Sequence, residues 1–218
     1  MAITVTDYQP DDTIAQDCYI YAMEADTAHN DTALWVGNLA SSGYKTRTLI
    51  GFDWIWTKYA NPKSYFLSDI TVKLYVEAHQ NTASRGILLY SIKRPFTETA
   101  TWNKYDGVNS WQTAGGTGAN DIEEYGTLYQ QTQSGWYMPA VGNWQTFRYP
   151  LEYFLKCLRG EGHYGMFIRN GVYETDDYFS TRCSSSSSAT AAQRPKYSFT
   201  YEPYHKIYLV KSGLGQVK

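Results

Sequence analysis

Apolar and polar residues alternate strictly between Ser68 and Ala78, and this is the clearest pattern in the chain. The apolar positions are Ile70, Val72, Leu74 and Val76, and the polar positions between them are Thr71, Lys73, Tyr75 and Glu77. Successive side chains of a strand point to opposite faces, so this period of two predicts a strand with one buried face. The segment Arg85–Arg94 follows a polar turn, and we expect it to neighbour this strand in an antiparallel sheet.

Further strands are predicted where short apolar or β-branched runs lie between turn residues. They span Gln16–Glu24, Ala33–Leu39, Lys45–Ile55, Asn143–Pro150, His163–Asn170, Asp176–Arg182 and Arg194–Pro203. One short helix is predicted after Pro150, because four apolar residues share one helix face and Gly160 follows them. These four residues are Leu151, Phe154, Leu155 and Leu158. The pattern predicts an all-β protein: an antiparallel β-sandwich of jelly-roll type with one short helix.

The composition supports this fold class. Aromatic residues make up 17% of the 218 residues, and 21 of them are tyrosines, a residue type that suits half-buried sheet surfaces. The region from Gly115 to Asn143 is rich in Gly, Gln, Thr and Asn and is expected to form loops with short strands. A run of five serines begins at Ser184 and is expected to be a solvated loop.

Charge and cysteine content exclude several classes of protein. The net charge is −2 and no basic block occurs, so we expect no nucleic-acid partner. No apolar run is long enough to span a bilayer, and the N-terminus resembles no signal peptide, so we expect no membrane insertion. The three cysteines, Cys18, Cys157 and Cys183, lack metal-ligand spacing and are expected to be free structural thiols.

The sequence contains no recognisable arrangement of catalytic residues. The four histidines fall in different segments, and His163 is interpreted as structural. The glycine-rich stretch after Thr113 lacks the lysine of a phosphate-binding loop. Adjacent carboxylates such as Asp176 and Asp177 point to opposite faces of a strand and cannot form a glycosidase pair there. Asp53 is expected in mid-strand, ion-paired with an arginine of a neighbouring strand. We therefore predict no enzyme and no required cofactor.

Calcium is the one metal ion that the sequence leaves open. Oxygen-bearing side chains gather near the first predicted strand, at Asp17, Asp26, Asn30 and Asp31. Such side chains are the ligands that Ca²⁺ prefers, although here they lack the regular spacing of a calcium loop. A structural calcium therefore stays an alternative to a metal-free protein.

Several phrases, taken in their order, resemble the DNRLRE family, which is related to disaggregatase-type and polysaccharide-binding modules. The most specific are "FTETATWN" followed by "SWQTAGG", and the closing "RPKYSFTYEP". Weaker matches include "DCYIYAM", "LWVGN", "RTLIGFDW", "ITVKLYV", "GHYGMFIR" and "YFST", so the resemblance runs from about Asp17 to Pro203. It implies a jelly-roll β-sandwich domain over 17–203, with an N-terminal extension over 1–16 and a docking tail over 204–218.

The resemblance also implies a function without catalysis. Members of this family are usually attached to secreted enzymes or surface proteins, and some are similar to modules that bind acidic polysaccharides. We expect no signal peptide and no attached enzyme, an architecture that resembles a phage virion component such as a capsid decoration, head fibre or tail protein. We expect a structural or adhesion protein on a particle or extracellular surface, homo-oligomeric or bound to other surface proteins. The alternative is a free polysaccharide-binding module for acidic glycans.

Two groups of residues are candidates for a role in binding or in the fold. If the outward faces of neighbouring strands align, Arg47, Lys73, Tyr75, Lys93 and Arg94 form a basic-aromatic patch that could bind an acidic glycan. The alternative is an ordinary solvated sheet face.

Trp102, Asn103 and Trp111 lie in the most family-like stretch and could form a sugar-stacking platform. We favour instead a structural aromatic loop, in which both tryptophans pack against the end of the sandwich and Asn103 and the glycines bend the chain.

Overall fold

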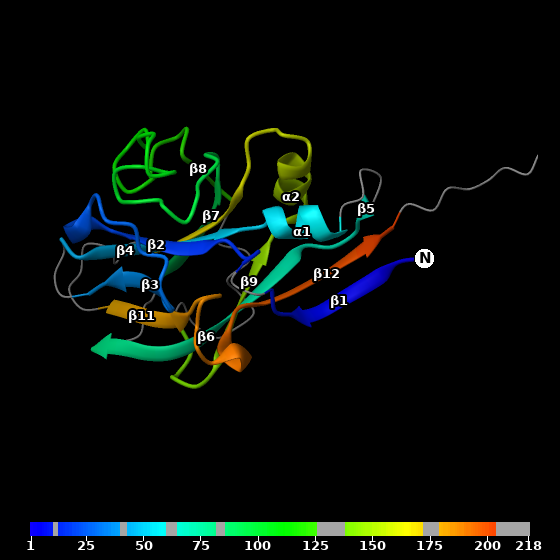
Figure 1. Ribbon diagram of the computed structural model, residues 1–218, viewed down its shortest axis with the longest axis horizontal. Coiled ribbons are helices and arrows are strands. Elements are labelled where there is room, and N and C mark those ends of the chain that lie inside the picture. The colour runs from blue at the N-terminus through cyan, green and yellow to red at the C-terminus, as the bar shows by residue number, and fades with distance from the viewer. Residues whose placement is uncertain are drawn as a thin grey trace, which may run out of the picture.

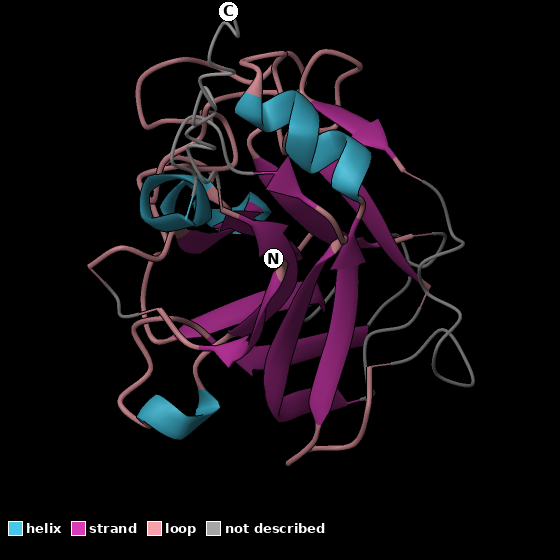
Figure 2. Ribbon diagram, turned by 90° about the vertical axis from the view of Figure 1, so that its right-hand side faces the viewer, coloured by secondary structure: helices cyan, strands magenta, loops and turns pink. Residues whose placement is uncertain are grey.

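The computed structural model describes residues 1–10, 13–39, 43–59, 65–81, 86–125, 138–171 and 179–203. Within these ranges, twelve strands form one antiparallel sheet that curls into a half-barrel (Figures 1 and 2). The predicted all-β, jelly-roll-like sandwich is therefore confirmed. No helix in the described part of the chain is long and apolar enough to cross a membrane.

The strands follow one another in a sheet order very different from their order in the chain. They are β1 Ile3–Tyr8, β2 Asp17–Tyr21, β3 Ala33–Asn38, β4 Lys45–Gly51, β5 Tyr65–Phe66, β6 Ile70–Asn81, β7 Ile87–Ile92, β8 Ile122–Glu124, β9 Trp144–Tyr149, β10 Gly165–Asn170, β11 Phe179–Ser184 and β12 Lys196–Glu202. The sheet order is β1-β12-β6-β11-β3-β4-β10-β7-β8, with β2 on β4, β5 on β12 and β9 on β6. The first strand, inside the predicted N-terminal extension, is thus hydrogen-bonded to the last.

Strand β6 joins the two halves of the sheet. Its first half pairs with β9 and β12, and its second half pairs with β11. Its four alternating apolar residues are fully buried, which confirms the predicted half-buried strand. The expected pairing of this strand with the next one is wrong, because β7 pairs with β8 and β10 instead. In the sheet, β11, β3, β4 and β10 lie between β6 and β7.

Two core clusters lie on opposite faces of the β4–β10–β7 part of the sheet. The main cluster fills the inside of the half-barrel and includes Ile50 and Ile168. The second cluster includes Leu49, Trp111 and Phe167 and lies between these strands and the loop over 97–121. That loop is the green segment above β2 and β4 in Figure 1. Every residue of β4 except Lys45 is therefore buried, because both faces of this strand are covered.

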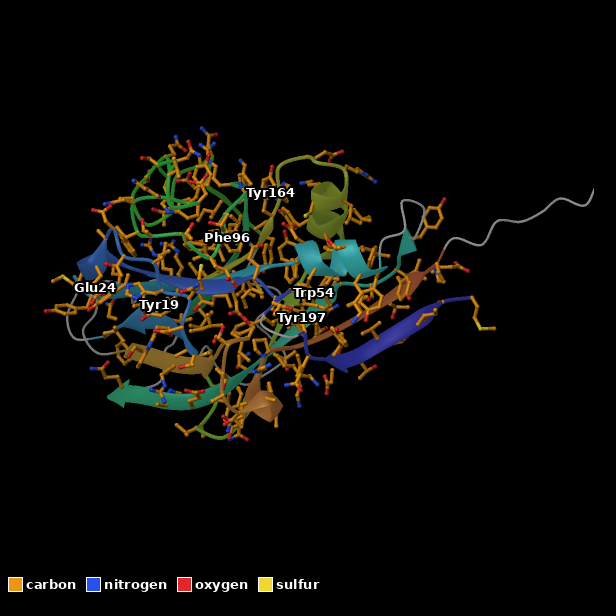
Figure 3. The ribbon with its side chains drawn as sticks, in the orientation of Figure 1. Tyr19, Glu24, Trp54, Phe96, Tyr164 and Tyr197 are labelled. Atoms are coloured by element: carbon orange, nitrogen blue, oxygen red, sulfur yellow. The ribbon has the colours of Figure 1, made fainter. Side chains whose placement is uncertain are left out.

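Helix α2, Leu151–Leu158, begins directly after Pro150 as predicted and buries Tyr153 and Phe154. The predicted strand Lys45–Ile55, however, ends at Gly51, and a second helix, α1 Asp53–Tyr59, follows it. Phe52 and Ile55 are fully buried, at the spacing of one helix face, and the neighbouring Trp54 is also buried. Figure 3 shows Trp54 near Tyr197 of β12, and their ring centroids are 4.9 Å apart.

The serine run is the clearest error of the predictions. Ser184, Ser185, Ser186 and Ser188 are at most 4% exposed, whereas a solvated loop was expected. Their hydroxyl groups can be buried because each of them forms a hydrogen bond within the protein. The hydroxyl of Ser184 donates to Glu77, and that of Ser185 donates to the carbonyl of Asp31. The described ranges also contain the 3-10 turns Ala22–Glu24 and Ala191–Gln193. The predicted tail over 204–218 and the pair Asp176–Asp177 lie outside the described residues.

Candidate functional site

The outer face of β1, β12, β6 and β9 is the candidate binding surface. Alternation along β6 points Thr71, Lys73 and Tyr75 away from the core, and all three are partly exposed. Their cross-strand partners point the same way: Tyr75 lies opposite Trp144, Lys73 opposite Lys196 and Thr146, and Thr71 opposite Ser198 and Arg148. We call this surface the outer face.

One end of the outer face is aromatic. The rings of Tyr75 and Trp144 meet edge to face with centroids 5.3 Å apart, a favourable arrangement for two aromatic rings. The Lys196 ammonium lies 4.2 Å from the centroid of the Trp144 ring, in a cation–π contact. We call Tyr75, Trp144 and Lys196 the aromatic patch. Both rings are partly exposed, so the patch offers aromatic carbon to a ligand once Lys196 moves aside.

An ion pair occupies the middle of the outer face. The Lys73 ammonium lies 2.7 Å from the Asp7 carboxylate, and the backbone N–H of Asp7 donates to the hydroxyl of Ser198. The hydrogen bond from Lys73 is the main reason that the pKa of Asp7 lies below its usual value, although burial opposes it. Asp7 adopts a φ of 49°, at the irregularity in the pairing of β1 with β12. These contacts of Asp7 hold the end of β1 against β6 and β12.

A polar groove of about 190 Å³ lies at the other end of the outer face. It is lined by Thr4, Ser68, Asp69, Thr71, Arg148, Ser198, Phe199 and Thr200. Nη2 of Arg148 donates to Oδ2 of Asp69 over 2.7 Å, and the backbone N–H of Leu151 donates to Oδ1 of Asp69 over 2.9 Å. The charged groups of the groove are therefore fixed in place and compensate each other.

The predicted patch residues do not come together. Lys73 and Tyr75 lie on the outer face, whereas Arg47 on β4 and the two residues that follow β7, Lys93 and Arg94, contact the loop over 97–121. Arg47 is only 4% exposed, donates to the carbonyl of Gly115, and lies 4.4 Å from the centroid of the Trp102 ring. It points away from the main core, but the loop covers that face.

Lys93 and Arg94 also bind to residues of the loop. Nζ of Lys93 donates to the carbonyl of Ala119 over 2.8 Å, and Nε of Arg94 lies 3.3 Å from Oδ1 of Asp121. Asp121 is fully buried and also accepts hydrogen bonds from the backbone N–H groups of Gln112, Thr113 and Gly118. These basic residues therefore fix the loop and add no charge to the candidate surface.

The two tryptophans of the loop differ in exposure, because Trp111 is buried and Trp102 is partly exposed. Trp111 is 4% exposed, and its Nε1 donates to the carbonyl of Thr101 over 2.9 Å. Trp102 packs against the second core cluster and lies against the Arg47 guanidinium. Asn103 ties the loop to the segment after β2, since its Nδ2 donates to Oδ1 of Asp26. Gly115 has a φ of 81°, and a Cβ there would lie 2.6 Å from the Trp102 ring. Trp111 therefore offers no stacking platform, and Arg47 covers one face of the Trp102 ring.

A serine, a histidine and a glutamate meet beside α2, a contact that sequence spacing did not reveal. The Ser91 hydroxyl lies 2.7 Å from Nδ1 of His163 and 2.5 Å from the Tyr149 hydroxyl. Nε2 of His163 lies 3.7 Å from Glu123. Burial lowers the pKa of His163, so the ring is neutral at pH 7. Ser91 is fully buried and is therefore not placed to attack a substrate.

The carboxylates considered for calcium turn to separate partners. Asp17 accepts hydrogen bonds from Ser186, Asp26 from Asn103, and Asp31 from the backbone N–H of Ala33. Within the described ranges, no three His, Cys, Asp or Glu side chains gather as a metal site. Here the protein itself supplies the hydrogen bonds that these carboxylates need.

A second hollow, of about 430 Å³, lies beside α1 and is lined by Ile14, Asp53, Trp54, Thr57 and Lys58. Burial raises the pKa of Asp53, which lies at the start of the helix and not in mid-strand as expected. The hollow is mostly apolar, and the aromatic rings beneath it belong to the core. Its Lys58 donates to the Tyr8 hydroxyl and lies over the partly exposed Tyr8 ring, so this hollow also brings a cation and an aromatic ring together.

The site residues that sequence reasoning missed are Trp144, Lys196 and Arg148. The predicted strands placed all three, but their pairing with β6 depends on contacts between residues at least 69 positions apart. A scan against protein-family models and a search of the curated proteins match nothing to this chain.

Proposed function

We propose that the chain is a non-catalytic adhesion module that binds a glycan on its outer face. The observation that carries this proposal is the pairing of two partly exposed aromatic rings, Tyr75 and Trp144, on a regular sheet surface. Sugar rings carry apolar C–H faces that pack on aromatic rings, and hydroxyl edges that hydrogen-bond to polar side chains. The outer face supplies both kinds of partner within one rigid surface.

Lys196 sets the charge preference of this site. Its ammonium covers the Trp144 ring, so a stacked sugar must displace it at a cost of about 0.5–1 kcal/mol. An acidic sugar recovers that cost, because the displaced ammonium can pair with its carboxylate. A neutral sugar recovers nothing. We therefore propose an acidic unit at the aromatic patch.

Glycan-array binding with matched variants tests the proposal. Trp144→Ala should weaken binding of every retained glycan at least about tenfold, the effect of losing about 1.4 kcal/mol. Tyr44→Ala removes a partly exposed ring beside β4 and should leave binding unchanged. Lys196→Ala should weaken binding of acidic glycans but not of neutral ones. Circular dichroism melts check that each variant is folded. A wild-type protein that binds no glycan, or an unchanged Trp144→Ala variant, overturns the proposal.

Display on a particle surface is the setting that we propose for this module. It is supported by the resemblance in the sequence and not by a residue of the site. Light scattering coupled to size-exclusion chromatography tests it, because a surface component is expected to self-associate or to bind other surface proteins. A strictly monomeric protein at high concentration would count against this setting while leaving glycan binding intact.

A further inference from the structure

We infer that the polar groove is a second sugar subsite, so that the ligand is an oligosaccharide chain lying along β6 from the aromatic patch to the groove. This inference rests on the proposed function and adds a length and a direction to the ligand. It is carried by the geometry of the outer face between its two ends.

The two ends are continuous but well separated. Thr71 lies in the groove and Tyr75 in the aromatic patch, with only Lys73 between them on the same face. Four residues of strand span about 13 Å, from a rise of about 3.3 Å per residue. A single sugar ring is too small to touch both ends, whereas a chain of several units reaches from one to the other.

The groove is built for hydroxyl groups rather than for charge. Of its eight lining residues, five are serines or threonines, each of which can donate and accept hydrogen bonds. The single cation, Arg148, is paired with the single anion, Asp69. A charged ligand group would have to compete with that pair, while a neutral hydroxyl can add to it. The groove therefore selects a neutral, hydroxyl-rich unit.

The polar groups of the groove are held in advance of binding. Asp69 is fixed by Arg148 and by the first backbone N–H of α2, and the hydroxyl of Ser68 accepts a hydrogen bond from the backbone N–H of Thr200. The hydroxyls of Thr4 and Thr200 lie 3.2 Å apart across β1 and β12. Groups that are already ordered lose little conformational entropy when a ligand binds, and this favours affinity.

Chain-length dependence tests the inference. The probes are three series of up to six units, measured by isothermal titration calorimetry: hyaluronan oligosaccharides, which alternate an acidic with a neutral unit, all-acidic oligogalacturonates, and all-neutral cello-oligosaccharides. For the series that binds, affinity should rise at least about tenfold between one or two units and the longest chain. The double variant Thr71→Ala, Arg148→Gln should lose that rise but bind the shortest binding oligomer as the wild type does. Trp144→Ala should weaken binding at all lengths.

Arg159→Gln removes an exposed arginine beyond α2 and is the matched control; it should keep the full rise. Melting curves of all variants exclude unfolding as the cause of a loss. Equal affinity for short and long chains, or a rise that survives in the groove variant, overturns the second subsite while glycan binding stands. If Trp144→Ala leaves binding unchanged, the proposed function itself falls. Failure of all three series to bind overturns both proposals.

Discussion

The carboxylate of Asp17 accepts hydrogen bonds from both the backbone N–H and the hydroxyl of Ser186, which lies 169 positions later in the chain. Both residues are buried, so the contact fastens the serine segment after β11 to the start of β2. It explains why serines that were expected in solvent lie inside the protein. Burial also raises the pKa of Asp17 to about 7, against the opposing effect of the hydrogen bonds from Ser186.

This raised pKa predicts that stability falls as the pH rises from about 4 to about 7. The folded state holds a proton on Asp17 in this window, whereas the unfolded state, with a pKa near 3.8, has lost it. The contribution is on the order of 4 kcal/mol at most. Asp17→Asn should remove this part of the pH dependence, measured by urea unfolding across the window. Equal slopes for variant and wild type would contradict the predicted protonation.

Removing the buried indole of the loop should destabilise the whole protein. Trp111→Ala should lower the free energy of unfolding by about 3–5 kcal/mol, because it opens a cavity in the second core cluster and leaves the Thr101 carbonyl without its donor. Trp111→Phe fills most of the space and should cost clearly less. Guanidinium unfolding followed by circular dichroism measures both. A negligible loss in Trp111→Ala would show that the loop is not part of the cooperative unit.

Asp121 is expected to control the order of the same loop. Asp121→Ala removes the acceptor of three backbone N–H groups and of Arg94, and should cost about 3 kcal/mol. Asp121→Asn keeps one acceptor oxygen and should cost less. Hydrogen exchange followed by mass spectrometry should show faster exchange across 112–121 in the alanine variant. Unchanged exchange there would refute this role.

The three cysteines should differ in reactivity. Cys18 and Cys183 are fully buried and should not react with a thiol reagent until the protein unfolds. Cys157 is partly exposed, but burial raises its pKa to about 12, so little thiolate is present at pH 8 and its reaction should be slow. Counting released chromophore under native and denaturing conditions checks this. Rapid labelling of any thiol in the native protein would contradict it.

The sequence predicted the strands and helices better than it predicted which strands pair with each other. The alternation in β6 and the apolar face of α2 are local patterns, and both elements form where they were expected. The face of β6 that points outward could be predicted for the same reason. Its partners could not, because Trp144 and Lys196 come from segments far along the chain.

The sequence also contained no sign that certain polar residues are buried. Arg47 alternates with core residues and would be exposed in a two-layer sandwich without a cover, but the loop over 97–121 lies on top of it. The helix at Asp53 was missed because a short apolar run with aromatic residues fits a strand as well as a helix.

The pairing of β1 with β12 has a consequence for how the protein reaches its fold. Ile3 of β1 pairs with Tyr201 of β12. The first half of β6 gains its hydrogen-bonded partners only when β9 and β12, which come much later in the chain, pair with it. Each of these pairings closes a long loop before any stabilising contact is gained, which slows the search for the native topology. We expect refolding on a timescale of milliseconds to seconds, which stopped-flow fluorescence of the tryptophans can follow. Until the last strand docks, the edges of β1 and β6 stand open, and this interval is when the chain is most prone to aggregate.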